Sequence, residues 1–134
     1  MERDRQSRTI LVVDDDHTIR MLLEAFLSNA GYTVVTAADG AEGLNCFMQH
    51  QYTVGLVLTD VMMPNMNGLD LADRVLELAP QLPVLFMSGD SRSASRGFGC
   101  LPKPFKEAEL IGRVREILPS QPPVMAVSSS ATMA

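Results

Sequence analysis

The stretch from Leu56 to Pro64 constrains the fold of this chain more than any other. An apolar run of strand-forming residues, 56–59, ends on one carboxylate, Asp60, and a loop containing Pro64 and Gly68 follows shortly after. A short apolar run bounded by turn residues is typical of a strand buried in a parallel sheet. Asp60 would then lie at the carboxyl end of that strand, where open α/β sheets bind their ligands.

The rest of the chain repeats this alternation of apolar strand patterns with helical patterns. We expect strands at 9–13, 32–36, 54–59, 84–87 and 98–101. Four helices are expected, each with one apolar face. The helix after Asp16 buries Ile19, Leu22, Leu23, Phe26 and Leu27, and the helix after Asp39 turns Leu44, Phe47 and Met48 inward. The third, from about Gly68, buries Leu69, Ala72, Val75 and Leu76, and the last covers 106–118. The pattern predicts an α/β fold, a doubly wound five-stranded parallel sheet with helices on both faces.

Length and composition suit one domain. The 134 residues are 46% hydrophobic and carry a formal charge of −5, with no basic run. This argues against nucleic acid or an anionic membrane as a partner. We expect the domain over 9–118, preceded by a charged arm at 1–8 and followed by a Pro-, Ser- and Ala-rich disordered tail at 119–134.

Two cysteines and no membrane segment indicate the compartment. Cys46 and Cys100 lie far apart without metal-type spacing, which favours free thiols. No apolar stretch is long enough for a signal peptide or a membrane span. We therefore expect a soluble cytoplasmic protein.

Residues capable of chemistry stand at or just after four of the five strand ends: Asp14 and Asp15, Asp60, Ser88 and Lys103. In a parallel sheet these ends share one edge, so the side chains converge. Three close carboxylates repel one another, and Mg²⁺ with its hard oxygen ligands would relieve that repulsion. A carboxylate beside a divalent cation and an ammonium suits nucleophilic attack on a phosphoryl group.

With these residues at its strand ends, the chain resembles a response-regulator receiver domain of two-component signalling, of the kind attached to hybrid histidine kinases. The resemblance is carried by Leu11-Val12-Val13-Asp14-Asp15-Asp16, Leu58-Thr59-Asp60-Val61-Met62-Met63-Pro64 with Gly68, Met87-Ser88-Gly89 and Leu101-Pro102-Lys103-Pro104-Phe105. Each piece is weak alone, but together, each at a strand end, they are highly specific. The resemblance implies a flavodoxin-like sheet of order 2-1-3-4-5.

The resemblance also implies roles for individual residues. Asp60 resembles the phosphoacceptor, and Asp15, Asp60 and the backbone carbonyl of Met62 resemble direct Mg²⁺ ligands. Asp14 resembles the acid that binds the metal through water.

Two further residues resemble parts that act on the phosphoryl group, Ser88 as the switch hydroxyl and Lys103 as its lysine partner. The donor would be a phosphohistidine on a sensor histidine kinase or a histidine phosphotransfer domain. Phosphorylation would switch binding to a downstream protein, and the domain would catalyse only its own phosphorylation and dephosphorylation, so it is not expected to be an enzyme in the usual sense.

Three departures from the family stand out. Only 14 residues separate Ser88 from Lys103, whereas two loops, a helix and a strand need roughly 20 or more, so the fourth helix of the family is expected to be shortened or absent. Cys100 occupies the usual position of a switch aromatic, and Phe98 is the possible substitute on the same strand face. Met62 is apolar where some relatives have a polar side chain, which suggests slow autodephosphorylation.

Two other functions remain open at this stage. Asp14-Asp15-Asp16-His17-Thr18 fits the D-x-D-x-T motif of haloacid-dehalogenase-like phosphatases, which would place the phosphate on Asp14. A pseudo-receiver that binds its partner without phosphate is the second alternative. The kinase, the target, the oligomeric state and whether the chain is a stand-alone protein or a fragment are left open by the sequence.

Overall fold

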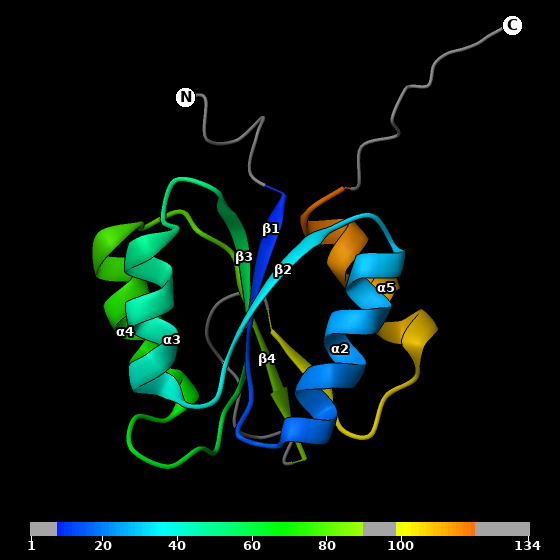
Figure 1. Ribbon diagram of the computed structural model, residues 1–134, viewed down its shortest axis with the longest axis horizontal. Helices are drawn as coiled ribbons and strands as arrows, with labels where there is room; N and C mark the ends of the chain where they lie inside the picture. The colour runs from blue at the N-terminus through cyan, green and yellow to red at the C-terminus, as the bar shows by residue number, and fades with distance from the viewer. Residues whose placement is uncertain (1–7, 90–98, 120–134) are drawn as a thin grey trace, which may run out of the picture.

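The computed structural model describes residues 8–89 and 99–119. Strands and helices alternate along these residues (Figure 1). The strands are β1 (Thr9–Val13), β2 (Thr33–Ala37), β3 (Val54–Asp60), β4 (Val84–Ser88) and β5 (Cys100–Pro102). The helices are α2 (His17–Asn29), α3 (Gly40–Gln49), α4 (Gly68–Leu78) and α5 (Glu107–Ile117).

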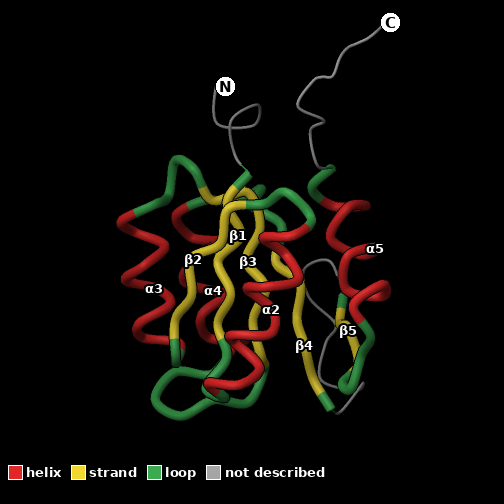
Figure 2. The backbone as a smooth tube through the Cα atoms, turned by 45° about the vertical axis from the view of Figure 1, so that its right-hand side comes forward, coloured by secondary structure: helices red, strands yellow, loops and turns green. Residues whose placement is uncertain are grey.

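The five strands form one parallel sheet in the order β2-β1-β3-β4-β5. Figures 1 and 2 show α3 and α4 together on one face and α2 and α5 on the other. Two apolar clusters, one on each face, are formed by side chains of the sheet and of the helices that pack against it. The central strands are buried on both faces, as expected when helices cover both sides of a parallel sheet. The predicted fold class and strand order are therefore confirmed.

The predicted elements differ from the structure in detail. Strands β2 and β5 begin one and two residues later than predicted, and four strands each end one residue later, at Ala37, Asp60, Ser88 and Pro102. On α3, Met48 was expected to point inward but is 52% exposed, and on α2 Leu22 is 46% exposed. Both predictions were wrong because an apolar side chain at helical spacing can also lie at the edge of the buried stripe.

Several predictions fall on residues outside those described. They concern the arm, the disordered tail, the shortened fourth helix between 90 and 97, and Phe98 as a substitute for the switch aromatic. The described residues contain four helices, in agreement with the number predicted. The domain limits at 9 and 118 likewise stay a prediction. No helix in the described ranges has the length and apolar character needed to cross a membrane.

The β3–α4 loop, residues 61–67, is pressed against the end of β3. The Gly68 amide donates to the Val61 carbonyl at 2.8 Å, and a Cβ at position 68 would overlap the carbonyl oxygen of Asp60. The Asn67 side chain accepts from the Asp70 amide at 2.9 Å and caps α4. The loop that follows Asp60 therefore turns back into a helix only because residue 68 has no side chain.

We expect Gly68→Ala to lower the free energy of unfolding by about 2–4 kcal/mol, because the new methyl group meets backbone that cannot move aside. The matched control is Gly112→Ala on α5, where a Cβ would meet nothing within 4 Å. That change should stabilise the chain by about 0.5–1 kcal/mol, since alanine is the better helix former. Urea unfolding of the three proteins measures both effects, and equal stability of the two variants would contradict the prediction.

Candidate functional site

Three carboxylates meet at the carboxyl edge of the sheet. Asp14 and Asp15 follow directly after β1, and Asp60 is the last residue of the neighbouring strand β3. One oxygen atom from each of the three lies within 4.8 Å of the others. The sequence placed these residues together because adjacent parallel strands end at the same edge, and the structure agrees.

Asp14 is fully buried, and both of its carboxylate oxygens have a partner. Its Oδ1 accepts the Asp16 amide at 2.9 Å, and its Oδ2 lies 3.0 Å from Lys103 Nζ. A buried carboxylate is tolerated only with such partners, because removing a charge from water is costly. Asp14 is therefore fixed in place and closed to solvent.

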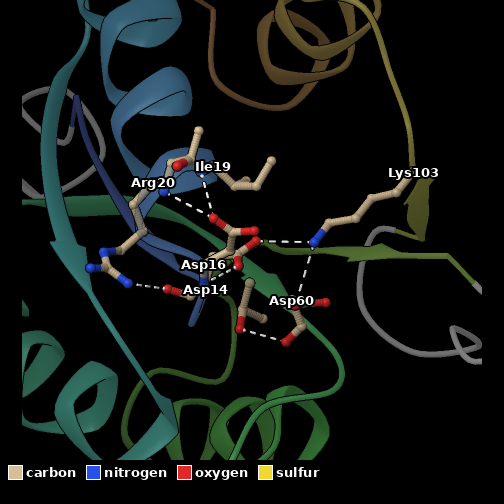
Figure 3. A network of polar contacts seen from close by, with 8 residues as sticks. Asp14, Asp16, Ile19, Arg20, Asp60 and Lys103 are labelled. Carbon is tan, nitrogen blue, oxygen red and sulfur yellow. Dashed lines mark hydrogen bonds and ion pairs between the residues drawn. The ribbon is translucent and has the colours of Figure 1, made fainter.

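The Lys103 side chain lies between the carboxylates of Asp14 and Asp60 and contacts both (Figure 3). Its Nζ lies 3.0 Å from Asp14 Oδ2 and 3.4 Å from Asp60 Oδ2. Its backbone amide donates to the Ser88 carbonyl at 2.9 Å, which continues the pairing of β4 with β5 past Pro102. The side chains of Ser88 and Lys103 thus come from two neighbouring strand ends, and Ser88 is buried.

Burial and neighbouring charges act in opposite directions on the pKa values of Asp60 and Lys103. Burial raises the pKa of Asp60, the Lys103 ammonium lowers it, and Asp14 and Asp15 raise it again, so the net pKa lies above the ordinary value. Burial lowers the pKa of Lys103, but Asp14 and Asp60 together outweigh burial and raise it. Lys103 therefore stays a cation, and Asp60 is a carboxylate whose charge is only partly compensated.

A neighbouring loop contains residues that the sequence analysis missed. The Asp16 side chain caps α2 by accepting the amides of Thr18 and Ile19. The Arg20 guanidinium donates to the backbone carbonyl of Asp14 at 2.7 Å and also lies 3.2 Å from His17 Nδ1. The available signal was an arginine one turn into the helix that follows the acidic run. Arg20 fixes the backbone of the β1–α2 loop from outside the acidic cluster.

The residues present fit a hard divalent cation. The three carboxylates offer oxygen ligands, and Asp15 is exposed while Asp60 is partly exposed, so an ion can reach both. Met62, whose carbonyl was predicted as a ligand, follows Asp60 in the β3–α4 loop, and its side chain is 72% exposed. Cys100 lies at the start of β5 and is partly buried.

Comparison with known proteins gives one consistent family. Residues 10–115 match the family model of the response regulator receiver domain. The transcriptional regulatory protein CpxR of Escherichia coli K12 is 36% identical over 116 residues, which cover 81% of this chain and 48% of CpxR. The chain thus spans about half the length of that curated relative.

Solved structures give the same result. The receiver domain of the hybrid histidine kinase CckA is 34% identical, with a TM-score of 0.74 over 82% of this chain and 98% of that one. The response regulator TrrA of Thermotoga maritima, solved in complex with Mg²⁺ and BeF, is 30% identical, with a TM-score of 0.76 over 83% of this chain and 99% of that one.

The raised pKa of Asp60 predicts how stability depends on pH. Folded Asp60 holds its proton to a higher pH than the unfolded chain does, so its ionisation costs stability as pH rises through the folded pKa. In the absence of divalent metal, Asp60→Asn should stabilise the protein at about pH 7 by less than about 1 kcal/mol, because solvent screens a partly exposed group. Near pH 3, where Asp60 is protonated in both states, the gain should vanish.

Thermal unfolding of both proteins with a chelator present, across that pH range, measures the difference. Lys103 keeps its contact with Asp14 in the variant. A variant that is less stable than the parent at neutral pH would show that the Lys103–Asp60 attraction exceeds the cost of burial.

Proposed function

The chain belongs to the response regulator receiver domain family, and from this premise we propose that it accepts a phosphoryl group on Asp60 in a two-component phosphorelay. The observation that carries the assignment to Asp60 is the difference in solvent access between the carboxylates of Asp14 and Asp60. The Asp14 side chain is fully buried, whereas the Asp60 side chain is 13% exposed. Of these two carboxylates, Asp60 is the one that offers an oxygen to an incoming donor without unfolding the strand end, which supports Asp60 over Asp14 and the receiver over the phosphatase.

We propose that Asp15, Asp60 and the Met62 carbonyl hold Mg²⁺, with Asp14 bound to it through water. The three-carboxylate cluster supports this, as does the solved complex of TrrA with Mg²⁺ and BeF. Bound Mg²⁺ supplies positive charge to phosphoryl oxygens. Asp14 is suited to an indirect role because its two oxygens already accept from Asp16 and Lys103.

The chain's own residues account for the remaining chemistry. A carboxylate oxygen of Asp60 forms a bond to phosphorus while the bond between phosphorus and the donor's nitrogen breaks, and that nitrogen keeps the electron pair and takes a proton from solvent. Lys103 remains a cation beside Asp60 and compensates charge on the phosphoryl oxygens. The Ser88 hydroxyl, on the adjoining strand end, donates to another oxygen.

The proposed donor is a phosphohistidine on a sensor histidine kinase or a histidine phosphotransfer domain. Support comes from the similarity to the CckA receiver, which is part of a hybrid histidine kinase. A downstream protein would bind the phosphorylated form differently, because the phosphoryl group carries about −1.5 to −2 charges where the Asp60 carboxylate carried one. The domain acts on its own aspartate and on no separate substrate.

The direct test is incubation with a small phosphodonor and Mg²⁺, followed by intact mass and peptide mapping. We expect one phosphate on Asp60, none in Asp60→Asn, and none when Mg²⁺ is chelated. Phosphate on Asp14 would instead support the phosphatase. No phosphate under any condition would support a pseudo-receiver that works without phosphorylation.

The apolar side chain of Met62 affects how long the phosphorylated state would last. Its thioether is exposed in the loop after Asp60 and is only a weak hydrogen-bond acceptor, so it cannot hold an attacking water. We propose slow autodephosphorylation and expect Met62→Asn to speed loss of the phosphate by about tenfold, since the amide can orient water. The control, Met62→Leu, should leave the rate unchanged. A parent half-life of only seconds would contradict the proposal.

A further inference from the structure

One side-chain contact joins the β3–α4 loop to the N-cap residue of α3. Asn65 Nδ2 donates to Asp39 Oδ2 at 3.0 Å, although the two residues lie 26 positions apart. Asn65 is also the one non-glycine residue in the described ranges with a positive φ, at 68°. Asparagine tolerates this left-handed conformation better than most residues. The backbone and the side chain of Asn65 are thus both committed to one loop shape.

Asp39 divides its two oxygens between two tasks. Oδ1 accepts the Glu42 amide at 2.8 Å and caps α3, while Oδ2 is left for Asn65. Glu42 in turn accepts the Ala38 amide at 2.7 Å, which holds the turn that carries Asp39. The Glu42 amide and the Asn65 amide both lower the pKa of Asp39, so it remains ionised at neutral pH.

The backbone beside this contact is tightly packed as well. A Cβ at position 40, the first residue of α3, would overlap the carbonyl of Met66. The loop is therefore held against the start of α3 through positions 65 and 66, and against the end of β3 through Gly68. Met62 lies between β3 and these contacts, in the same short loop.

We propose that Asp39 and Asn65 are positioning residues for the Mg²⁺ site, because their hydrogen bond sets the loop conformation that presents the Met62 carbonyl. This inference rests on the proposed function, since it concerns the same metal. Neither residue is among the proposed ligands of the ion. Their effect is to hold the loop in one arrangement, so that a metal does not have to order it on binding.

Two variants remove the contact with little other change. Asp39→Ser keeps one oxygen to cap α3 but has none left for the loop. Asn65→Gly removes the amide and adopts the positive φ without strain. Each should weaken Mg²⁺ binding to the unphosphorylated protein by about three- to tenfold in calorimetric titration. The double variant should be no weaker than the single ones, because both break the same contact.

A second readout separates positioning from a general structural role. The Mg²⁺ concentration for half-maximal phosphorylation by a small phosphodonor should rise by the same factor, while the rate at saturating Mg²⁺ stays within about twofold of the parent. The matched control is Asn67→Ser, which changes the cap of α4 in the same loop. It should leave the Mg²⁺ affinity unchanged.

The outcomes distinguish this inference from the function on which it rests. If the parent binds Mg²⁺ and is phosphorylated on Asp60, but both variants match it in Mg²⁺ affinity, only the positioning role is overturned. If Asn67→Ser weakens binding as much as the two variants do, the Asp39–Asn65 contact has no special role and the inference also fails. If the parent neither binds Mg²⁺ nor takes phosphate, the proposed function itself is overturned.

Discussion

The site depends on one imbalance of charge, in which three carboxylates share the edge of a sheet with one ammonium. Lys103 lies within 3.4 Å of both Asp14 and Asp60, and its charge offsets only part of theirs. Burial strengthens this electrostatic conflict because the low local dielectric screens it poorly. The raised pKa of Asp60 is the measurable result. A bound divalent cation would therefore relieve a conflict that is built into the fold.

The fold creates this conflict as a consequence of its topology, and the topology could be predicted from the sequence. Strands that are apolar throughout must be covered on both faces, which requires a parallel sheet with helices on either side. All carboxyl ends then share one edge. The convergence of Asp14, Asp60 and Lys103 follows from this rule alone, although 89 positions separate Asp14 from Lys103. Chemistry-bearing residues at strand ends are thus brought together without any local motif.

Contacts that depend on how loops pack could not be predicted in this way. Arg20 donates to the backbone of Asp14 and Asn65 donates to the side chain of Asp39, and nothing in the spacing of either residue indicates its partner. Met48 and Leu22 show the complementary error, since periodicity identifies a helical face but not where its boundary lies. Side-chain spacing therefore predicts layers and strand ends, whereas the contacts that fix loop shape depend on the full three-dimensional arrangement.

The strand ends on either side of Asp60, those of β1 and β5, hold the site in different ways, and this bears on how a change at Asp60 would spread. Asp14 is locked by Asp16, Lys103 and Arg20, so the β1 side is rigid. Lys103, in contrast, reaches Asp60 from just after the three-residue strand β5, and its own backbone amide donates to the Ser88 carbonyl. When the charge at Asp60 changes, the attraction on Lys103 changes with it, and the short strand β5 is the neighbouring element with the fewest backbone pairs to resist movement. A change of charge at Asp60 would therefore act on Lys103 and β5 before it acts on the buried acid on β1.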